Sequence, residues 1–196
     1  MLKRSFDIGS ALAALILLSP LFVILGIAIR LTSRGPVFYG AVRSGRSGKP
    51  FRMWKFRSMV TGAECLGGLS TGKDDVRITP LGRILRRYKL DELPQLINVL
   101  RGEMSIVGPR PEVPHYTSQY TDEEKLILTV RPGITDYASI RFRNLENVLG
   151  KEQPDQVYEA QVKPLKNALR IQYVKEHTFW RDLILIAQTL KAIFAA

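Results

Sequence analysis

The longest uninterrupted apolar stretch of the chain lies near its N-terminus. From Ile8 to Ile29 there is no charged residue, and at about 1.5 Å per residue a helix of this length reaches across a hydrocarbon core of about 30 Å. Ser19 and Pro20 interrupt the stretch at its centre. Because proline removes an intrahelical hydrogen bond, we expect a bend or break there, with the Ser19 hydroxyl able to satisfy a freed carbonyl. The pattern predicts a membrane segment broken at these two residues.

Positive charges flank this segment on both sides. Lys3 and Arg4 precede it, and Arg30 and Arg34 follow it, whereas a spanning anchor usually concentrates its basic residues on one side. Two helices that each reach about 15 Å deep would leave both ends on the same face, which makes residues 1–34 a re-entrant anchor. A kinked spanning helix fits the composition equally well. A cleaved signal peptide fits less well, because the run exceeds the usual length of about 7–15 residues and no small-x-small cleavage site follows it.

Shorter apolar runs follow and predict a compact domain over residues 35–196. Residues 37–39 and 51–56 are rich in aromatic and apolar side chains and flank a loop of Gly, Ser and Arg, which predicts a β-hairpin. Residues 61–73 contain several glycines and little periodic hydrophobicity. This composition predicts a mobile loop that could close over a ligand.

Helical patterns dominate the rest of the chain. Thr79 and Pro80 supply an N-cap and a first-turn proline for one helix. A second helix has apolar residues at offsets of three, four and seven and ends at Gly102, and acidic residues after Thr121 favour a third. Residues 179–194 form a broad apolar helix that either packs on the core or lies in the membrane interface.

Composition limits the class of partner. The chain has 196 residues and a formal net charge of +11, which fits one domain with an attached element and partners that carry phosphate, on lipid, nucleotide or nucleic acid. The single cysteine, Cys65, excludes an internal disulfide and favours a reducing, cytoplasm-facing location. His115 and His177 are too few for a soft-metal cluster.

Asp91 and Glu92 form the most reactive candidate pair in the sequence. Carboxylates near a helix start are stabilised by the helix dipole, and nearby arginines can be their solvated counterions, so a structural role explains the pair taken alone. However, Pro94 places the pair at a helix entrance, and Arg110 stands between two prolines a short distance further on. These features favour a chemical role.

Paired carboxylates suit a divalent cation and a phosphate substrate. Mg²⁺ prefers oxygen ligands and commonly bridges one or two carboxylates to substrate phosphates. One carboxylate would then hold metal while the other attacks phosphorus, which splits a difficult transfer into two steps. Arginines would neutralise the charge on the transferring phosphoryl group.

Read together, four motifs resemble the bacterial sugar transferase family, and more narrowly its small monotopic phosphoglycosyl transferases. The resemblance covers nearly the whole chain, including the apolar segment with its Ser-Pro. Each motif is weak alone, and their order and spacing make the match specific. The motifs are Lys55-Phe56-Arg57-Ser58-Met59, Leu90-Asp91-Glu92-Leu93-Pro94-Gln95-Leu96, Gly108-Pro109-Arg110-Pro111 and Arg131-Pro132-Gly133-Ile134-Thr135.

The resemblance implies a reaction. Members of the family transfer a sugar 1-phosphate from a UDP-sugar to polyprenyl phosphate, usually undecaprenyl phosphate, and release UMP. Asp91 would be the nucleophile that forms an aspartyl phosphosugar intermediate, and Glu92 would be its partner in binding Mg²⁺. The resemblance associates Arg86 and Arg110 with phosphate or metal-site organisation. It adds three candidates for the same basic pocket, namely Lys55, Arg57 and Arg131. For each of these three, a solvated or structural role is equally open.

The resemblance also implies the fold and location. It predicts an α+β fold that is mostly α, in which a re-entrant membrane helix-break-helix precedes a compact cytoplasmic catalytic domain with a small β-hairpin and interfacial helices. Such an anchor would hold the catalytic domain on the cytoplasmic face of the bacterial inner membrane, in contact with membrane lipids. The larger family members carry further membrane helices and an accessory domain, so we expect this chain to be a minimal catalytic unit for exopolysaccharide or related glycan synthesis.

One stretch departs from some relatives, which carry Gly-Trp after the last motif. Here Asp136-Tyr137 occupies that place. We interpret it as a subgroup difference in the nucleotide-sugar region, which leaves the sugar open, and Asp136 could instead cap a turn.

Two other functions remain open from the sequence. A non-catalytic, membrane-anchored basic module that binds anionic lipid or nucleic acid would explain the charge and the anchor but not the ordered motifs, and we find no nucleic-acid-binding motif and expect no nucleic-acid partner. A metal-dependent lipid phosphatase would release inorganic phosphate instead of UMP. The oligomeric state, including a homo-oligomer, is also open.

Overall fold

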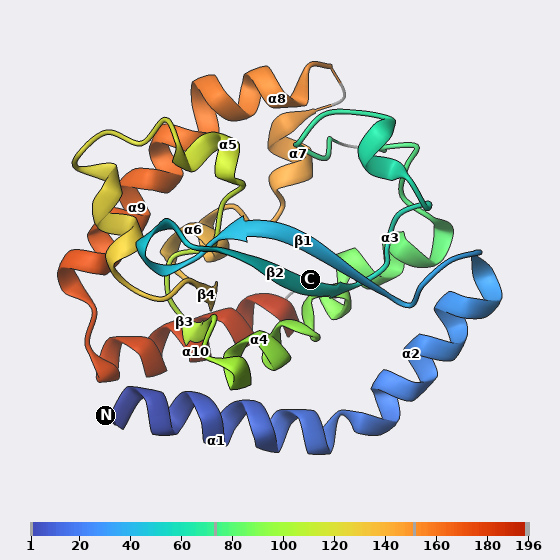
Figure 1. The fold of residues 1–196 in the computed structure, drawn as a ribbon, viewed down its shortest axis with the longest axis horizontal. Helices are drawn as coiled ribbons and strands as arrows, with labels where there is room; N and C mark the ends of the chain where they lie inside the picture. The colour runs from blue at the N-terminus through green and yellow to red at the C-terminus, as the bar shows by residue number, and fades with distance from the viewer. Residues whose placement is uncertain (1, 73, 151, 195–196) are drawn as a thin grey trace.

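The computed structural model describes residues 2–72, 74–150 and 152–194, which form a mostly helical body with a helical arm along one side (Figure 1). The arm consists of α1 (Leu2–Leu17) and α2 (Ser19–Thr32), which meet at a bend of 61°. Ser19 Oγ donates to Ile16 O at 2.8 Å, so the serine satisfies a carbonyl beside the predicted break. Within the described ranges no single helix is long and apolar enough to cross a bilayer, although the two arm helices meet that test as a bent pair.

Both ends of the arm are bonded to the body. At the start of α1, the buried Asp7 accepts a hydrogen bond from Ile106 N at 3.1 Å. Just after α2, the Arg57 guanidinium donates to Ser33 O at 2.7 Å and to Arg34 O at 2.9 Å. The arm is therefore held to the body at both ends, and between them one face of it packs on the body, with Ala11 of α1 and Leu25 of α2 in buried apolar clusters. Large apolar side chains of the arm nevertheless remain exposed, among them Leu12, Ile16, Leu17, Val23, Ile24, Ile27 and Leu31.

The predicted hairpin is confirmed. Strands β1 (Phe38–Ser44) and β2 (Pro50–Phe56) pair antiparallel, with Phe38 opposite Phe56 and Ser44 opposite Pro50. A 3₁₀ turn, η1 (Arg46–Gly48), connects them, and a second short one, η2 (Ala63–Cys65), lies in the loop that follows.

The two helices predicted next are also present. Helix α3 (Pro80–Arg87) begins after Thr79, whose hydroxyl accepts a hydrogen bond from Gly82 N at 2.9 Å. A 3₁₀ turn, η3 (Leu90–Glu92), leads into α4 (Gln95–Arg101), which ends at Gly102 in the left-handed conformation with φ of 81°. Glycine adopts this conformation without a side-chain clash.

A second sheet was not predicted. Strands β3 (Ser105–Val107) and β4 (Gly133–Thr135) pair in parallel. The backbones beside them approach so closely that a Cβ on Gly133 would lie 2.1 Å from Gly108 N. The pairing brings the Gly-Pro-Arg-Pro segment against the Arg-Pro-Gly segment, and glycine at both crossing points makes this approach sterically possible.

Short helices complete the body. The helix predicted after Thr121 is a 3₁₀ helix that starts later, and a reciprocal cap precedes it, with Thr121 N donating to Glu124 Oε2 at 2.9 Å. The remaining elements in chain order are α5 (Pro114–Thr117), η4 (Glu124–Thr129), α6 (Tyr137–Arg141), α7 (Leu145–Leu149), α8 (Pro154–Val157), the π-helical η5 (Tyr158–Val162), α9 (Lys163–Glu176) and α10 (Phe179–Phe194).

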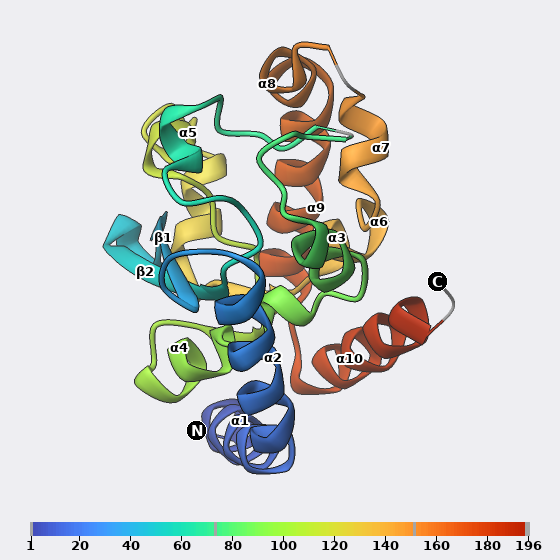
Figure 2. The same ribbon diagram turned by 90° about the vertical axis from the view of Figure 1, so that its right-hand side faces the viewer.

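The last helix, α10, lies beside the start of α1 (Figure 2). Phe179 packs edge-on against Phe6 with ring centroids 5.5 Å apart, and Lys3 forms an ion pair with the buried Asp182. Trp180 on the same helix is 73 % exposed. The helix therefore packs on the core through one face and leaves apolar side chains outside. The mostly helical α+β class is confirmed, with two small sheets.

Candidate active site

The acidic pair lies at a sharp turn between α3 and α4. Lys89 has a φ of 57°, a left-handed conformation that costs a non-glycine residue free energy. This turn ends α3 and starts η3, so that Asp91 is directed into the protein and is only 3 % exposed. Strained backbone at a buried carboxylate is consistent with a functional site.

Glu92 is held by two cations. Lys55 Nζ on β2 lies 3.2 Å from Glu92 Oε1, and the Arg110 guanidinium donates to the same oxygen. Burial opposes the charge on Glu92, but Arg110 and then Lys55 outweigh it and hold the pKa of this carboxyl below its usual range. Glu92 is therefore an ionised anchor for the two basic side chains.

Asp91 has a different environment from its neighbour. Asp91 Oδ2 lies 3.9 Å from Lys55 Nζ, which is beyond hydrogen-bond distance, and Oδ1 has no hydrogen-bond partner among the described residues. Burial raises the pKa of Asp91, the charge of Glu92 adds to the rise, and Lys55 and Arg86 oppose it. A desolvated carboxylate with unused lone pairs is a reactive oxygen nucleophile.

Two hydrogen bonds fix Arg110, one donated by its backbone and one by its side chain. Its N–H donates to Asp136 Oδ2 at 3.0 Å, and Nη1 donates to Ile134 O at 3.2 Å. Asp136 is fully buried and also accepts from Ser139 N at 2.6 Å, so it caps α6 as the sequence allowed. One aspartate therefore ties the Arg110 loop to the helix that follows β4.

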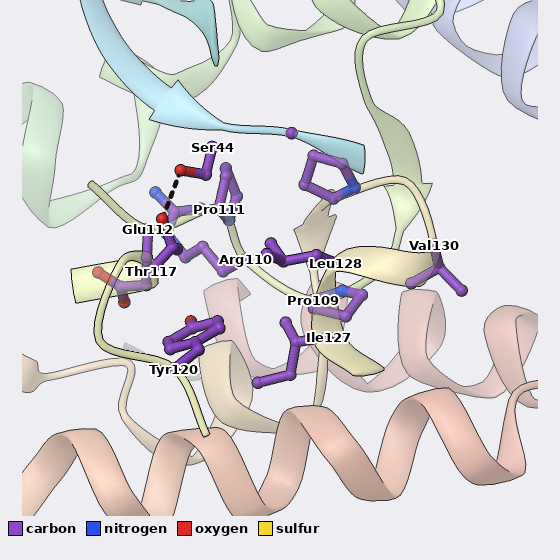
Figure 3. Close-up of a pocket in the computed structure, with 12 residues that line it drawn as sticks. Ser44, Pro109, Arg110, Pro111, Glu112, Thr117, Tyr120, Ile127, Leu128 and Val130 are labelled. Carbon is purple, nitrogen blue, oxygen red and sulfur yellow. Dashed lines mark hydrogen bonds between the residues drawn. The ribbon is translucent and has the colours of Figure 1, made fainter. Parts of the chain in front are cut away.

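A small cavity lies on the other side of the Pro-Arg-Pro segment (Figure 3). Its volume is about 10 Å³, enough for a single water molecule. Ser44 and Thr117 join their hydroxyls at 2.7 Å on its wall, and Glu112 and Tyr120 line it as well. The cavity is too small for a substrate and marks the tightly packed support of Arg110.

The charge of Arg86 acts on Asp91, while its hydrogen bonds go to α7 and the glycine-rich loop. Its guanidinium donates to Glu146 Oε1 of α7 at 3.1 Å and to Thr71 Oγ1 at 3.3 Å. Arg77 holds the same loop by donating to Gly68 O at 3.1 Å. Closure of residues 61–73 over a ligand stays a prediction, and Lys73 lies outside the described residues.

Arg57 and Arg131 have their hydrogen bonds elsewhere. Arg57 clamps the end of α2, and Arg131 Nε donates to Gly102 O at 2.9 Å. Arg131 also lines a separate cavity of about 200 Å³ with Lys3 and Arg46. The structure thus brings four of the basic and acidic candidates together at Asp91, namely Glu92, Lys55, Arg86 and Arg110, and phosphate contact by Arg57 or Arg131 stays a prediction.

The residues behind this site gave no signal in the sequence. Glu112 accepts hydrogen bonds from the Tyr158 hydroxyl and from Arg170 Nη2, the latter at 2.7 Å. Lys166 lies over the Tyr158 ring at 5.1 Å, and burial lowers the pKa of its amine to about 8. Only the helical spacing of Lys166 and Arg170 on α9 could have indicated that they share a face.

The carboxylates of Asp91 and Glu92 could bind a magnesium ion together with water and substrate, but they do not form a site in which protein side chains supply all the ligands. Among the described residues, no three His, Cys, Asp or Glu side chains converge to hold a metal. Two adjacent carboxylates, one with a free Oδ1, fit Mg²⁺, which keeps several waters and takes further ligands from phosphate.

Comparison with known proteins identifies relatives of this chain. The family model described as bacterial sugar transferase matches residues 1–196. The chain is 36 % identical over 195 residues to an uncharacterized sugar transferase, EpsL, of Bacillus subtilis, covering 100 % of this chain and 88 % of that protein. It is 37 % identical to the exopolysaccharide production protein ExoY of Rhizobium meliloti, covering 98 % and 85 %.

A longer relative carries a more specific name. The UDP-glucose:undecaprenyl-phosphate glucose-1-phosphate transferase of Escherichia coli is 37 % identical over 194 residues, which are 97 % of this chain and 39 % of that protein. With a family match over its whole length and the paired carboxylates in place, the chain belongs to the bacterial sugar transferase family and is a transferase.

Proposed function

We propose that this protein transfers a sugar 1-phosphate from a UDP-sugar to polyprenyl phosphate, such as undecaprenyl phosphate, and so starts lipid-linked glycan assembly. The observation that carries the proposal is the buried Asp91, whose Oδ1 has no partner among the described residues, while Oε1 of the neighbouring Glu92 is bound by two cations. The names of the relatives support the substrate class, since the Escherichia coli protein is a glucose-1-phosphate transferase acting on undecaprenyl phosphate.

In the first step, an Asp91 carboxylate oxygen attacks the phosphorus that bears the sugar. The bond between this phosphorus and the bridging oxygen breaks, and UMP leaves with the electron pair. An aspartyl phosphosugar results. In the second step, an oxygen of polyprenyl phosphate attacks the same phosphorus, which releases the Asp91 carboxylate and forms a polyprenyl diphosphate sugar.

The basic residues supply charge where the transition state needs it. The side chains of Lys55 and Arg110 are 19 % and 20 % exposed, so a ligand can reach them, yet both are already oriented by Glu92. Preorganised cations of this kind stabilise charge on the transferring phosphoryl oxygens. Arg86, held by Glu146 and Thr71, adds a third positive charge that acts on Asp91.

Asp91 and Glu92 are the residues that would hold Mg²⁺. The ion would neutralise charge on the diphosphate of the donor and favour departure of UMP. Glu92 keeps its carboxylate ionised through Arg110 and Lys55, which suits a metal ligand.

We further propose that the arm is a re-entrant anchor in the inner membrane, with the catalytic domain on the cytoplasmic face. The bend at Leu18 and the exposed apolar side chains of the arm support insertion. Asp7 and Arg57 support re-entry, because each bonds one end of the arm to the same body. Labels placed at Ser5 and Arg34 should both react from the cytoplasmic side, and labelling from opposite sides would contradict the topology.

The activity is tested with purified protein, Mg²⁺, undecaprenyl phosphate and a panel of UDP-sugars. We expect UMP release that depends on the metal and on one or a few of the sugars. Release of inorganic phosphate from the lipid without UMP would identify a phosphatase instead. Tight binding of lipid or nucleic acid with no turnover of any donor would identify a non-catalytic module.

A further inference from the structure

Asp91 belongs to a buried stripe along one helical run. From Leu90 to Arg101 the chain is right-handed helical throughout, as η3, two helical residues and α4. The buried positions Asp91, Gln95 and Asn98 are four and three residues apart, which is the spacing of one helix face. Gln95 therefore follows Asp91 by about one turn on the same side.

Asn98 shows which element this face meets. Its Oδ1 accepts from Trp54 N of β2 at 2.9 Å, and its Nδ2 donates to Arg52 O of β2 at 2.7 Å. At the other end of the stripe, Asp91 faces Lys55 of the same strand. Gln95 lies between these two positions on the same helix face, so we place its buried carboxamide on the side that meets β2.

Gln95 differs from Asn98 in its hydrogen bonding. Both residues are 0 % exposed. Neither Oε1 nor Nε2 of Gln95 has a hydrogen-bond partner among the described residues, and the same holds for Asp91 Oδ1 one turn away. A buried polar group without a partner costs about 1–3 kcal/mol. An amide donor and a carboxylate acceptor that both lack partners on one helix face lower the stability of the free protein, and a hydrogen bond formed between them in a bound state would remove this cost.

Resting on the function proposed above, we propose that Gln95 is a positioning residue for the nucleophile: when the sugar-phosphate donor is bound, its Nε2–H group donates to Asp91 Oδ1. This hydrogen bond holds one carboxylate oxygen, so that Oδ2 is presented to phosphorus. Lys55 cannot do this alone, because its ammonium is 3.9 Å from Asp91 and is shared with Glu92 at 3.2 Å. Fixing an attacking group in one orientation lowers the barrier without strengthening binding of the substrate.

The test compares Gln95→Met, which keeps length and volume but lacks the N–H group, with Asn98→Leu as a matched buried amide. The measured quantities are kcat and KM for UMP release, the yield of a phosphosugar adduct on Asp91 by mass spectrometry, and the melting temperature. For Gln95→Met we expect kcat to fall between about 10-fold and 100-fold with KM for the UDP-sugar nearly unchanged. Its melting temperature should equal or exceed that of the wild type, because no hydrogen bond is lost in the free protein. Asn98→Leu should instead lower the melting temperature, because it leaves Trp54 N and Arg52 O without partners.

Two results would overturn the role of Gln95. One is a Gln95→Met variant with kcat within about twofold of wild type, since a positioning loss should be larger. The other is a fall in melting temperature, or a failure to fold, matching Asn98→Leu, which would make Gln95 a structural amide of the β2 edge. If the wild type itself forms neither UMP nor the adduct, the proposed function fails and the role of Gln95 falls with it. Wild-type activity with an unaffected Gln95→Met variant rejects the role of Gln95 alone.

Discussion

Two clusters of buried acidic and basic side chains, one around Glu112 and one around Asp91, lie on either side of the rigid Pro-Arg-Pro segment. Their carboxylates differ in how many of their oxygens have hydrogen-bond partners. Around Glu112, the carboxylate accepts from Tyr158 and from Arg170, whose side chain is fully buried. Around Asp91, the cations bind Glu92, and Asp91 Oδ1 is left without a partner in the described structure. Both clusters contain acid and arginine, so composition does not distinguish them. A carboxylate held by both a tyrosine and an arginine indicates a structural role, even though Arg170 Nε lacks a partner among the described residues. A carboxylate with a buried, unpartnered oxygen indicates the candidate reactive site.

The clusters are linked through the backbone between Arg110 and Glu112. The two side chains are two residues apart and serve different clusters, with Arg110 on Glu92 and Glu112 on Arg170. Pro109 and Pro111 restrict the backbone on both sides of Arg110. The structural cluster therefore fixes the position from which Arg110 reaches the reactive one.

The largest expected effect is on the reactive cluster. Asp91→Asn should reduce UMP release by at least about 10³-fold, because a carboxamide cannot form the covalent intermediate. Its melting temperature should stay the same or rise, because a desolvated charge is removed. Turnover assays and thermal melts of the same preparation check both, and near-normal turnover would remove Asp91 from the role of nucleophile.

The structural cluster should respond in the opposite way. Arg170→Met leaves the Glu112 carboxylate buried without its guanidinium, which should cost about 3–5 kcal/mol of unfolding free energy. Denaturant unfolding followed by circular dichroism measures this loss, with Arg83→Met at an exposed position of α3 as a control expected to change little. A loss below about 1 kcal/mol would show that the cluster is not structural.

The pH dependence of stability should follow Glu112. Burial opposes its charge, but Arg170 and then Lys166 outweigh burial and lower its pKa to about 2 from the usual 4.5. A carboxyl with a lowered folded-state pKa stabilises the protein fully above the usual value and loses this contribution as pH falls from 4.5 toward 2. The contribution is about 3 kcal/mol. In Glu112→Gln, the unfolding free energy should fall less steeply than in the wild type as pH is lowered across this range. An equally steep fall would contradict the role of Glu112.

The smallest expected effect is at Arg131. Its guanidinium bonds Gly102 O and lines the separate cavity, away from the carboxylate pair. Arg131→Gln should therefore change kcat/KM for UMP release by less than about threefold, as expected for a residue outside the reacting group. Arg110→Gln, measured in the same assay, should lower kcat/KM much more than Arg131→Gln does. Equal losses would restore Arg131 to the phosphate site that the sequence motif suggested.

Local patterns predicted much of the fold. Thr79-Pro80 starts α3, Gly102 ends α4, and the hairpin flanks its glycine-rich turn, because each depends on backbone preferences or side-chain periodicity within a few residues. The parallel pairing of β3 with β4 escaped prediction. These strands are three residues each and lie far apart in the sequence, so neither has a recognisable period.

The sequence by itself singled out the candidate reactive pair and the kinds of residue around it, since Asp91-Glu92, Arg86, Arg110 and Lys55 stand in ordered motifs. Only the tertiary structure decided which cations meet the pair. Arg57 and Arg131 stand in equally ordered motifs, yet they bond to the end of α2 and to Gly102. Which cations lie near the pair depends on burial and hydrogen bonding between segments that are distant in the sequence. The same packing leaves the Gln95 amide without a partner among the described residues and gives the Asn98 amide its hydrogen bonds, although both are buried on one helix.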